Sequence, residues 1–132
     1  MIKTIIAVIS GYITLAVLTF FTFACIDWAF PSALPEPDGY PSLTWAFLIL
    51  SFSFCYAFIA GYVTAWLSDS HLGALLSLTA ILMGLAILSV FLSPTTIHQP
   101  LPYGFAIIGV NTAAPLLGGL LRKIVTHTVW NK

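Results

Sequence analysis

Charged residues are scarce in this chain of 132 residues, of which only 6% are Asp, Glu, Lys or Arg. Soluble domains carry about 25% charged residues, so a water-soluble fold of this composition would lack the side chains that normally cover its surface. The four basic and four acidic residues leave no net charge. No cluster of Lys and Arg residues is present that could bind the phosphates of a nucleic acid. We therefore expect the lipid bilayer, and no nucleic acid, as the partner of most of the surface.

Cysteines and catalytic motifs are equally sparse. The two cysteines, Cys25 and Cys55, fall inside apolar runs and form no CxxC pair, which argues against a disulfide scaffold or a zinc site. No G-x-S-x-G motif offers an activated nucleophile beside an oxyanion hole. Asp69 and His71 flank Ser70, and helix capping accounts for all three. The sequence predicts no catalytic residue, no metal site and no enzyme activity.

Ionisable residues are also missing from the middle of the apolar runs. No Asp, Glu, Lys or Arg occurs between Ser70 and Arg122. Charged groups at mid-depth mark proton relays, ion-coupled transporters and voltage sensors, so their absence excludes these classes. Small multidrug transporters also have four helices, but they need a carboxylate within the first one. Here the first run offers only Asp27, near the boundary of the membrane.

Apolar residues are what the chain has in excess: 60% of it is hydrophobic, and the mean hydropathy is +1.05. A helix needs about 20 apolar residues to cross roughly 30 Å of hydrocarbon. The first run is longer than the h-region of a signal peptide, so we expect it to remain as a helix. Prolines mark two loops, Pro31–Pro41 and Ser93–Pro102, and the first of them also carries Glu36 and Asp38. The predicted helices cover residues 4–30, 42–67, 71–92 and 103–121, the last one continuing as an interfacial stretch toward Trp130.

The basic residues predict the orientation of these four spans. With an even number of spans, all four basic residues share one side of the membrane: Lys3, Arg122, Lys123 and Lys132. Lys and Arg accumulate on the cytoplasmic side. The predicted fold is an all-α, integral membrane four-helix bundle, a single transmembrane domain over residues 1–132, with both termini cytoplasmic.

Small residues at four-residue spacing predict where the helices pack, because small side chains let backbones approach closely in lipid. Packing within one bundle is the first interpretation, and an interface between chains is the second. Further small pairs are Ala7 with Gly11 and Ala80 with Gly84. The predicted packing residues are Ser53, Ala57, Gly61, Ala65, Gly109, Ala113 and Gly118, the last spaced four residues from Ala114.

Two residues are weak candidates for contact with a ligand. Asn111 is the one strongly polar side chain in the predicted spans, and Pro115 cannot donate to its carbonyl, which predicts a kink. A hydrogen bond from Asn111 to a neighbouring helix is the first interpretation, and contact with a substrate or pigment is the second. His71 is the best candidate for an axial ligand, although no two histidines share a transmembrane site. The sequence predicts no cofactor.

Three segments of the chain resemble small uncharacterised bacterial inner-membrane proteins with four helices. These are Ala60-Gly-Tyr-Val-Thr-Ala65, His71 at the start of the third run, and Pro115-Leu-Leu-Gly-Gly-Leu-Leu-Arg122. The chain departs from that group at Pro102-Tyr-Gly104, where such proteins often carry Trp-Tyr-His. The group has no established activity, so the resemblance implies the fold and the inner-membrane location alone.

The sequence favours a non-enzymatic accessory or packing subunit of a larger bacterial membrane complex. Extreme hydrophobicity, short extramembrane segments and small-residue spacing support this interpretation. The alternative is an oligomeric pore or carrier for a small or lipophilic molecule. That function would need polar residues converging on a lumen, for which Asn111 and Thr112 are the only indication.

Overall fold

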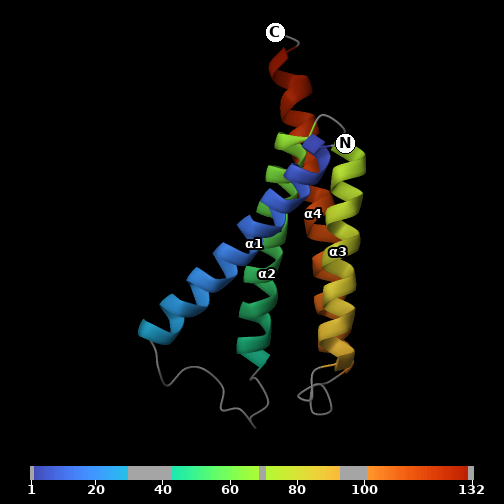
Figure 1. Ribbon diagram of the computed structural model, residues 1–132. Coiled ribbons are helices and arrows are strands. Elements are labelled where there is room, and N and C mark those ends of the chain that lie inside the picture. Colours follow the sequence, from blue (N-terminus) through green and yellow to red (C-terminus); the bar gives the residue numbers. More distant parts are fainter. Residues whose placement is uncertain (1, 30–42, 69–70, 93–100, 131–132) are drawn as a thin grey trace.

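The computed structural model describes residues 2–29, 43–68, 71–92 and 101–130, and these residues form four helices (Figure 1). The helices are α1 (Ile2–Ala29), α2 (Leu43–Leu67), α3 (His71–Leu92) and α4 (Leu101–Trp130). All four are long and apolar enough to cross a membrane. The predicted cap at Ser70 and the two proline-containing loops up to residue 100 lie outside the described residues. The prediction of an all-helical protein with four candidate membrane spans is confirmed.

The fourth helix is longer than its predicted apolar span. It begins at Leu101 and continues through Pro115 to Trp130 as one helix of 30 residues. The stretch after Arg122 contains neither Gly nor Pro, so nothing in it terminates a helix. The last turns of α4 project beyond the ends of the other three helices (Figure 1). The helix therefore continues beyond the apolar span, at least to Trp130.

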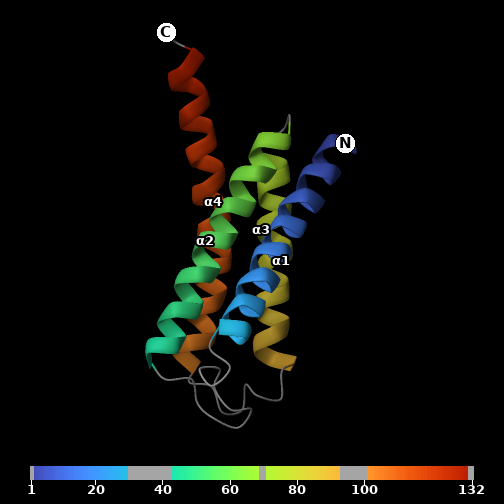
Figure 2. The same ribbon diagram turned by 90° about the vertical axis from the view of Figure 1, so that its left-hand side faces the viewer.

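The four helices run alternately up and down. α1 and α3 run in one direction and α2 and α4 in the other, so both chain termini lie at the same end of the bundle (Figures 1 and 2). We call this the terminus end; it holds the start of α1, the end of α2, the start of α3 and the end of α4. The opposite end is called the loop end. An important consequence of this topology is that α2 and α4 are parallel to each other.

α2 is the central helix and contacts each of the other three, whereas α1 and α4 are not in contact within the described residues. Most of the buried apolar side chains are alanines, because helices in lipid gain from close backbone approach and not from hydrophobic collapse. A cluster of Ala60, Leu78 and Leu82 joins α2 to α3, and Val8 and Leu15 of α1 pack against it. The buried apolar residues are Ala7, Ala57, Ala60, Ala65, Ala74, Leu75, Leu78, Leu82, Ala86 and Ala114.

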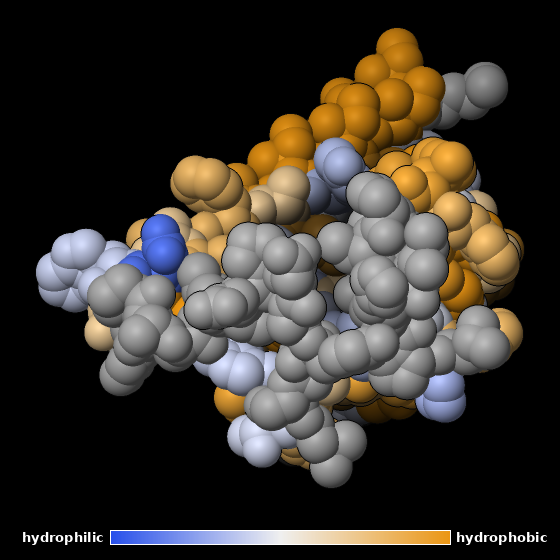
Figure 3. All heavy atoms as spheres, turned by 90° about the horizontal axis from the view of Figure 1, so that it is seen from below, coloured by the Kyte–Doolittle hydropathy of each residue, from blue (hydrophilic) through white to orange (hydrophobic). Residues whose placement is uncertain are grey.

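Most of the apolar surface remains outside this small core. Viewed from the loop end, hydrophobic side chains occupy much of the periphery of the molecule (Figure 3). α1 is the least covered helix: only 11% of its most apolar window is buried, and Phe20 is 78% exposed. α1 also diverges from α2 toward the loop end (Figure 1). Such a surface is stable in hydrocarbon and not in water, which fits a multi-pass membrane protein.

Candidate functional site

Hydroxyl groups inside the spans are mostly satisfied within their own helix. A Ser or Thr side chain in a membrane helix bonds the carbonyl four residues earlier, since no water is available there. Thr112 donates to the carbonyl of Ile108 at 2.8 Å, and Thr79 donates to that of Leu75 at 2.8 Å. The same bond is made by Thr14, Ser51, Ser77, Thr126 and Thr128. These groups are therefore not free to line a polar pathway.

Two hydroxyl groups of α2 bond to α1 instead. Thr64 is fully buried, and its hydroxyl donates to the carbonyl oxygen of Ala7 at 3.3 Å. A Cβ added at Gly11 would lie 3.0 Å from the carbonyl oxygen of Ala60 and closer still to Oγ1 of Thr64. The missing side chain at Gly11 is thus what allows Thr64 to reach α1. Nearer the loop end, Tyr56 donates its phenolic hydroxyl to Thr22.

The closest approach between helices is the crossing of α2 and α4. A Cβ added at Gly61 would lie 2.6 Å from Cα and 2.7 Å from the carbonyl carbon of Pro115. A Cβ added at Gly118 would lie 2.9 Å from the carbonyl carbon of Phe58 and 3.0 Å from the amide nitrogen of Tyr62. Both neighbours are backbone atoms, so no side-chain rotation can make room. This crossing involves two of the predicted packing residues, Gly61 and Gly118.

The other predicted packing residues fall into two groups. Ala57 and Ala65 are buried on the side of α2 that carries Gly61, and Ser53 is partly buried on it. Gly109 and Ala113, by contrast, are exposed, and a Cβ at Gly109 would meet nothing within 4 Å. At about 100° per residue, Gly109 is half a turn of the helix away from Gly118. In a single chain Gly109 and Ala113 therefore do not take the packing role predicted for them.

Small residues also face outward from α3. Ala80 is exposed, and a Cβ at Gly84 would meet nothing within 4 Å. Gly73 and Ser77 continue this exposed row toward the terminus end. The row lies opposite the buried face of α3, which carries Leu78 and Leu82. α3 and α4 therefore present small residues on two faces, of which only one is used inside the bundle.

Asn111 lies one turn before the crossing of α2 and α4, on the same side of α4 as Pro115. Its side chain is partly buried and makes no hydrogen bond to any other residue that the structure describes. Pro115 is fully buried and has no N–H to give to the Asn111 carbonyl. The hydrogen bond predicted from Asn111 to a neighbouring helix is therefore not formed within the described part of the chain.

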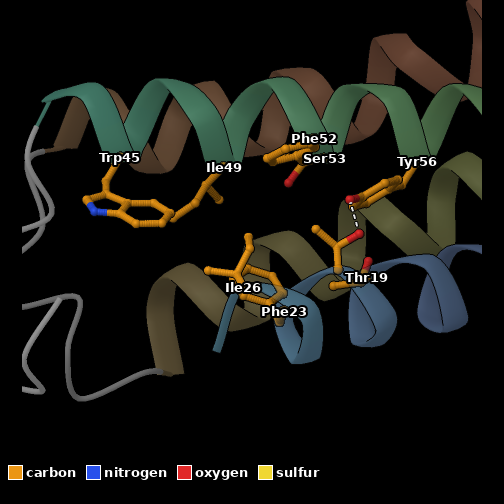
Figure 4. Close-up of a pocket in the computed structure, with 9 residues that line it drawn as sticks. Thr19, Phe23, Ile26, Trp45, Ile49, Phe52, Ser53 and Tyr56 are labelled. Carbon is orange, nitrogen blue, oxygen red and sulfur yellow. Dashed lines mark hydrogen bonds between the residues drawn. The ribbon is translucent and has the colours of Figure 1, made fainter. Parts of the chain in front are cut away.

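A cleft lies between α1 and α2 (Figure 4). Trp45 and Ile49 of α2 face Phe23 and Ile26 of α1 across it, and the hydrogen bond from Tyr56 lies toward the terminus end (Figure 4). Its enclosed volume is about 20 Å³, which is room for about one water molecule. Ligand pockets usually measure about 300 Å³ or more. The lining residues are Thr19, Thr22, Phe23, Ile26, Trp45, Ile49, Phe52, Ser53 and Tyr56.

Sequence reasoning did not identify this cleft. Each of its residues is of a type common in membrane helices. The cleft exists because α1 diverges from α2 toward the loop end, which leaves an opening between their facing side chains (Figure 1). The pairing of Tyr56 with Thr22 joins residues 34 positions apart and carries no signal in the local pattern. The one available indication was Trp45 at the boundary of a predicted span, where aromatic residues gather.

A metal or haem site finds no support in the described side chains. Among them, no three His, Cys, Asp or Glu residues come together. Cys25 and Cys55 are both exposed and unbridged. The side chain of His71, the other weak candidate, lies outside the described residues. Comparisons with protein-family models, curated proteins and solved structures found no significant match, so the resemblance to small bacterial inner-membrane proteins stays a prediction.

Proposed function

We propose that this protein is a non-enzymatic accessory subunit that packs against other membrane-spanning chains in a bacterial inner membrane. One observation carries the proposal: α3 and α4 present outward small residues that the bundle itself does not use. On α4 these are Gly109 and Ala113, and on α3 they are Ala80 and Gly84. A helix that faces only lipid gains nothing from small residues, whereas a partner helix can approach closely over them.

The distribution of buried surface supports the same function. Between 11% and 28% of the most apolar window of each helix is buried inside the bundle, which leaves large faces available to neighbours. The extramembrane segments are short, so recognition must use the helices themselves. The absence of an intramembrane ionisable group, noted in the sequence, removes the usual basis of coupled transport.

The basic residues support an orientation with the terminus end in the cytoplasm. Lys3, Arg122 and Lys123 all belong to helix segments at that end, and Lys132 follows α4 in the sequence. Positive charge is retained on the cytoplasmic side during insertion. A protein of this orientation exposes only two short loops to the opposite side.

The proposed function is tested by purification from native membranes in mild detergent, followed by identification of the chains that remain bound. Ala113→Leu is expected to release the partner, because the larger side chain holds a neighbouring helix away, while the fold is unchanged. Ala16→Leu is the matched control, since Ala16 is exposed on α1 between the bulky residues Tyr12 and Phe20. Retention of the same partner chains by Ala113→Leu and by Gly84→Leu would refute the proposal.

The cleft between α1 and α2 favours a second candidate, an oligomeric carrier for a lipophilic molecule. Four hydroxyl-bearing residues, Thr19, Thr22, Ser53 and Tyr56, line an otherwise apolar opening. A second chain placed against the cleft would enclose it. Mass spectrometry of organic extracts from the purified protein, with Trp45→Ala as the variant, tests this candidate. A specific small molecule lost in the variant supports it, and identical extracts remove it.

A further inference from the structure

Two polar side-chain atoms are buried without a hydrogen-bond partner among the described residues: Oγ of Ser68 and Nε of Arg122. Ser68 follows the end of α2 and is 3% exposed. Arg122 is partly buried on α4. An unsatisfied buried donor is unfavourable, and more so when it is charged, so folded proteins rarely retain one without a reason. Both groups can donate a hydrogen bond, and neither finds an acceptor in the bundle.

The helix geometry brings these two donors to the same region. Gly61 of α2 contacts Pro115 of α4, and the two helices are parallel (Figure 1). Ser68 comes seven residues after Gly61, and Arg122 comes seven residues after Pro115. Seven residues are nearly two full turns and a rise of about 10.5 Å. Both donors therefore lie on the same sides of their helices as the crossing residues, about two turns farther toward the terminus end.

The start of α3 completes this region. A Cβ added at Gly119 would lie 2.8 Å from Cδ1 of Leu75, so the first turns of α3 pack against α4 just before Arg122. α3 begins at His71, three residues after Ser68, and runs for 22 residues away from this end. The first N–H groups of a helix have no partner within the helix itself, and the helix start carries a partial positive charge. The end of α2, the start of α3 and α4 near Arg122 thus lie in one region, which contains hydrogen-bond donors and positive charge.

We propose that this region of the terminus end binds a phosphate oxyanion through the Arg122 guanidinium and the Ser68 hydroxyl. A phosphate has several acceptor oxygens and accepts from both donors at once, and the start of α3 adds favourable potential. A water molecule would satisfy the hydroxyl but would not compensate the cation. The span Thr44–Leu67 ends and the span Leu72–Leu92 begins at this level, whereas the span Pro102–Thr126 continues four residues past Arg122. These limits put the site near the boundary of the apolar spans, where lipid headgroups are expected. The phosphate is therefore that of an anionic phospholipid.

The test uses the full-length protein in detergent and three probes. They are dioctanoyl phosphatidylglycerol, inorganic phosphate, and dioctanoylglycerol, which has the same chains without phosphate. Dioctanoyl phosphatidylglycerol is expected to raise the unfolding temperature and to bind measurably by native mass spectrometry, whereas dioctanoylglycerol does neither. A rise with inorganic phosphate that equals the rise with the lipid supports the oxyanion site and identifies free phosphate as its source. Equal binding of dioctanoylglycerol overturns the proposal.

Variants show whether the two donors hold the phosphate. Ser68→Ala and Arg122→Gln are each expected to weaken binding of dioctanoyl phosphatidylglycerol by roughly tenfold or more, as for a hydrogen bond to a charged group. Lys123→Gln removes the same charge from an exposed neighbour and is expected to change the dissociation constant less than about twofold, as a surface charge does. Equal losses in Arg122→Gln and Lys123→Gln overturn the proposal. If Arg122→Gln does not fold, Ser68→Ala and Arg122→Lys decide the same question.

The competing partner for Arg122 is Asp69, which follows Ser68 in the sequence. Under the proposal, Asp69→Asn removes a neighbouring negative charge, so it leaves the unfolding temperature unchanged and tightens lipid binding. An ion pair between Arg122 and Asp69 has the opposite signature. In that case Asp69→Asn and Arg122→Gln lower the unfolding temperature equally, the double variant lowers it no further, and the proposal is refuted.

Discussion

Replacement of Gly61 by alanine is the most direct perturbation of the α2–α4 crossing. The added Cβ would lie 2.6 Å from Cα of Pro115, whereas ordinary contacts begin at 3.4 Å. The two backbones must therefore separate by about 0.8 Å or more. The neighbouring atoms belong to the α4 backbone, so separation also disturbs the packing of Ala57 and Ala114, both of which are fully buried.

Overpacking in a well-packed core costs about 1–3 kcal/mol, and a backbone collision belongs at the upper end of that range. We expect Gly61→Ala and Gly118→Ala each to lose about 2–3 kcal/mol of unfolding free energy. Gly119→Ala is expected to lose less, because its Cβ meets the side chain of Leu75, which can change rotamer. Gly109→Ala is the matched control and is expected to change the unfolding free energy by no more than about 0.5 kcal/mol.

Reversible unfolding in mixed micelles with increasing sodium dodecyl sulfate, followed by circular dichroism, measures these differences. The expected order of destabilisation is Gly61→Ala and Gly118→Ala first, then Gly119→Ala, then Gly109→Ala. The reasoning fails if Gly109→Ala destabilises as much as Gly61→Ala. In that case the helix faces of α4 would be assigned incorrectly.

Three further predictions follow from the topology and the polar groups. The first uses a chain whose native cysteines are replaced by serine. In it, Asp38→Cys is expected to react with a membrane-impermeant maleimide from outside the cell, and Ser70→Cys is expected to react only after lysis. Labelling of residue 70 in intact cells would contradict four spans. Pro115→Ala is expected to weaken assembly more than Asn111→Leu, because a fully buried ring at the crossing is lost. Asn111→Leu removes a polar group from hydrocarbon, and even an interhelical hydrogen bond in a membrane would be worth only about 0.6 kcal/mol. If Asn111→Leu instead leaves an assembled protein that has lost a bound lipid or pigment, Asn111 is a ligand residue. Tyr56→Phe removes the bond to α1 and is expected to cost about 0.6 kcal/mol, with about 1.7 as the ceiling; a loss above 3 kcal/mol in the same unfolding assay would contradict this reasoning.

The sequence alone predicts the number and approximate limits of the helices. A span is a property of one segment, set by the length of apolar chain needed to cross hydrocarbon, and prolines interrupt the chain between spans. The second and third helices, Leu43–Leu67 and His71–Leu92, therefore agree with the predicted limits to within one residue. The fourth differs because apolarity predicts the part in lipid, while the helix itself continues to Trp130.

The face that each helix turns inward was decided only by the tertiary structure. In a soluble protein the polar side of a helix marks its outer face, but here apolar residues lie all around each helix, so the pattern distinguishes no side. Gly118 and Gly109 are alike in sequence, yet one lies at a backbone crossing and the other meets nothing within 4 Å. Ser68 and Arg122 are 54 positions apart and lie toward the same end of the bundle only because α2 and α4 run in the same direction. Contacts of this kind depend on the crossing of two helices, which no single segment encodes.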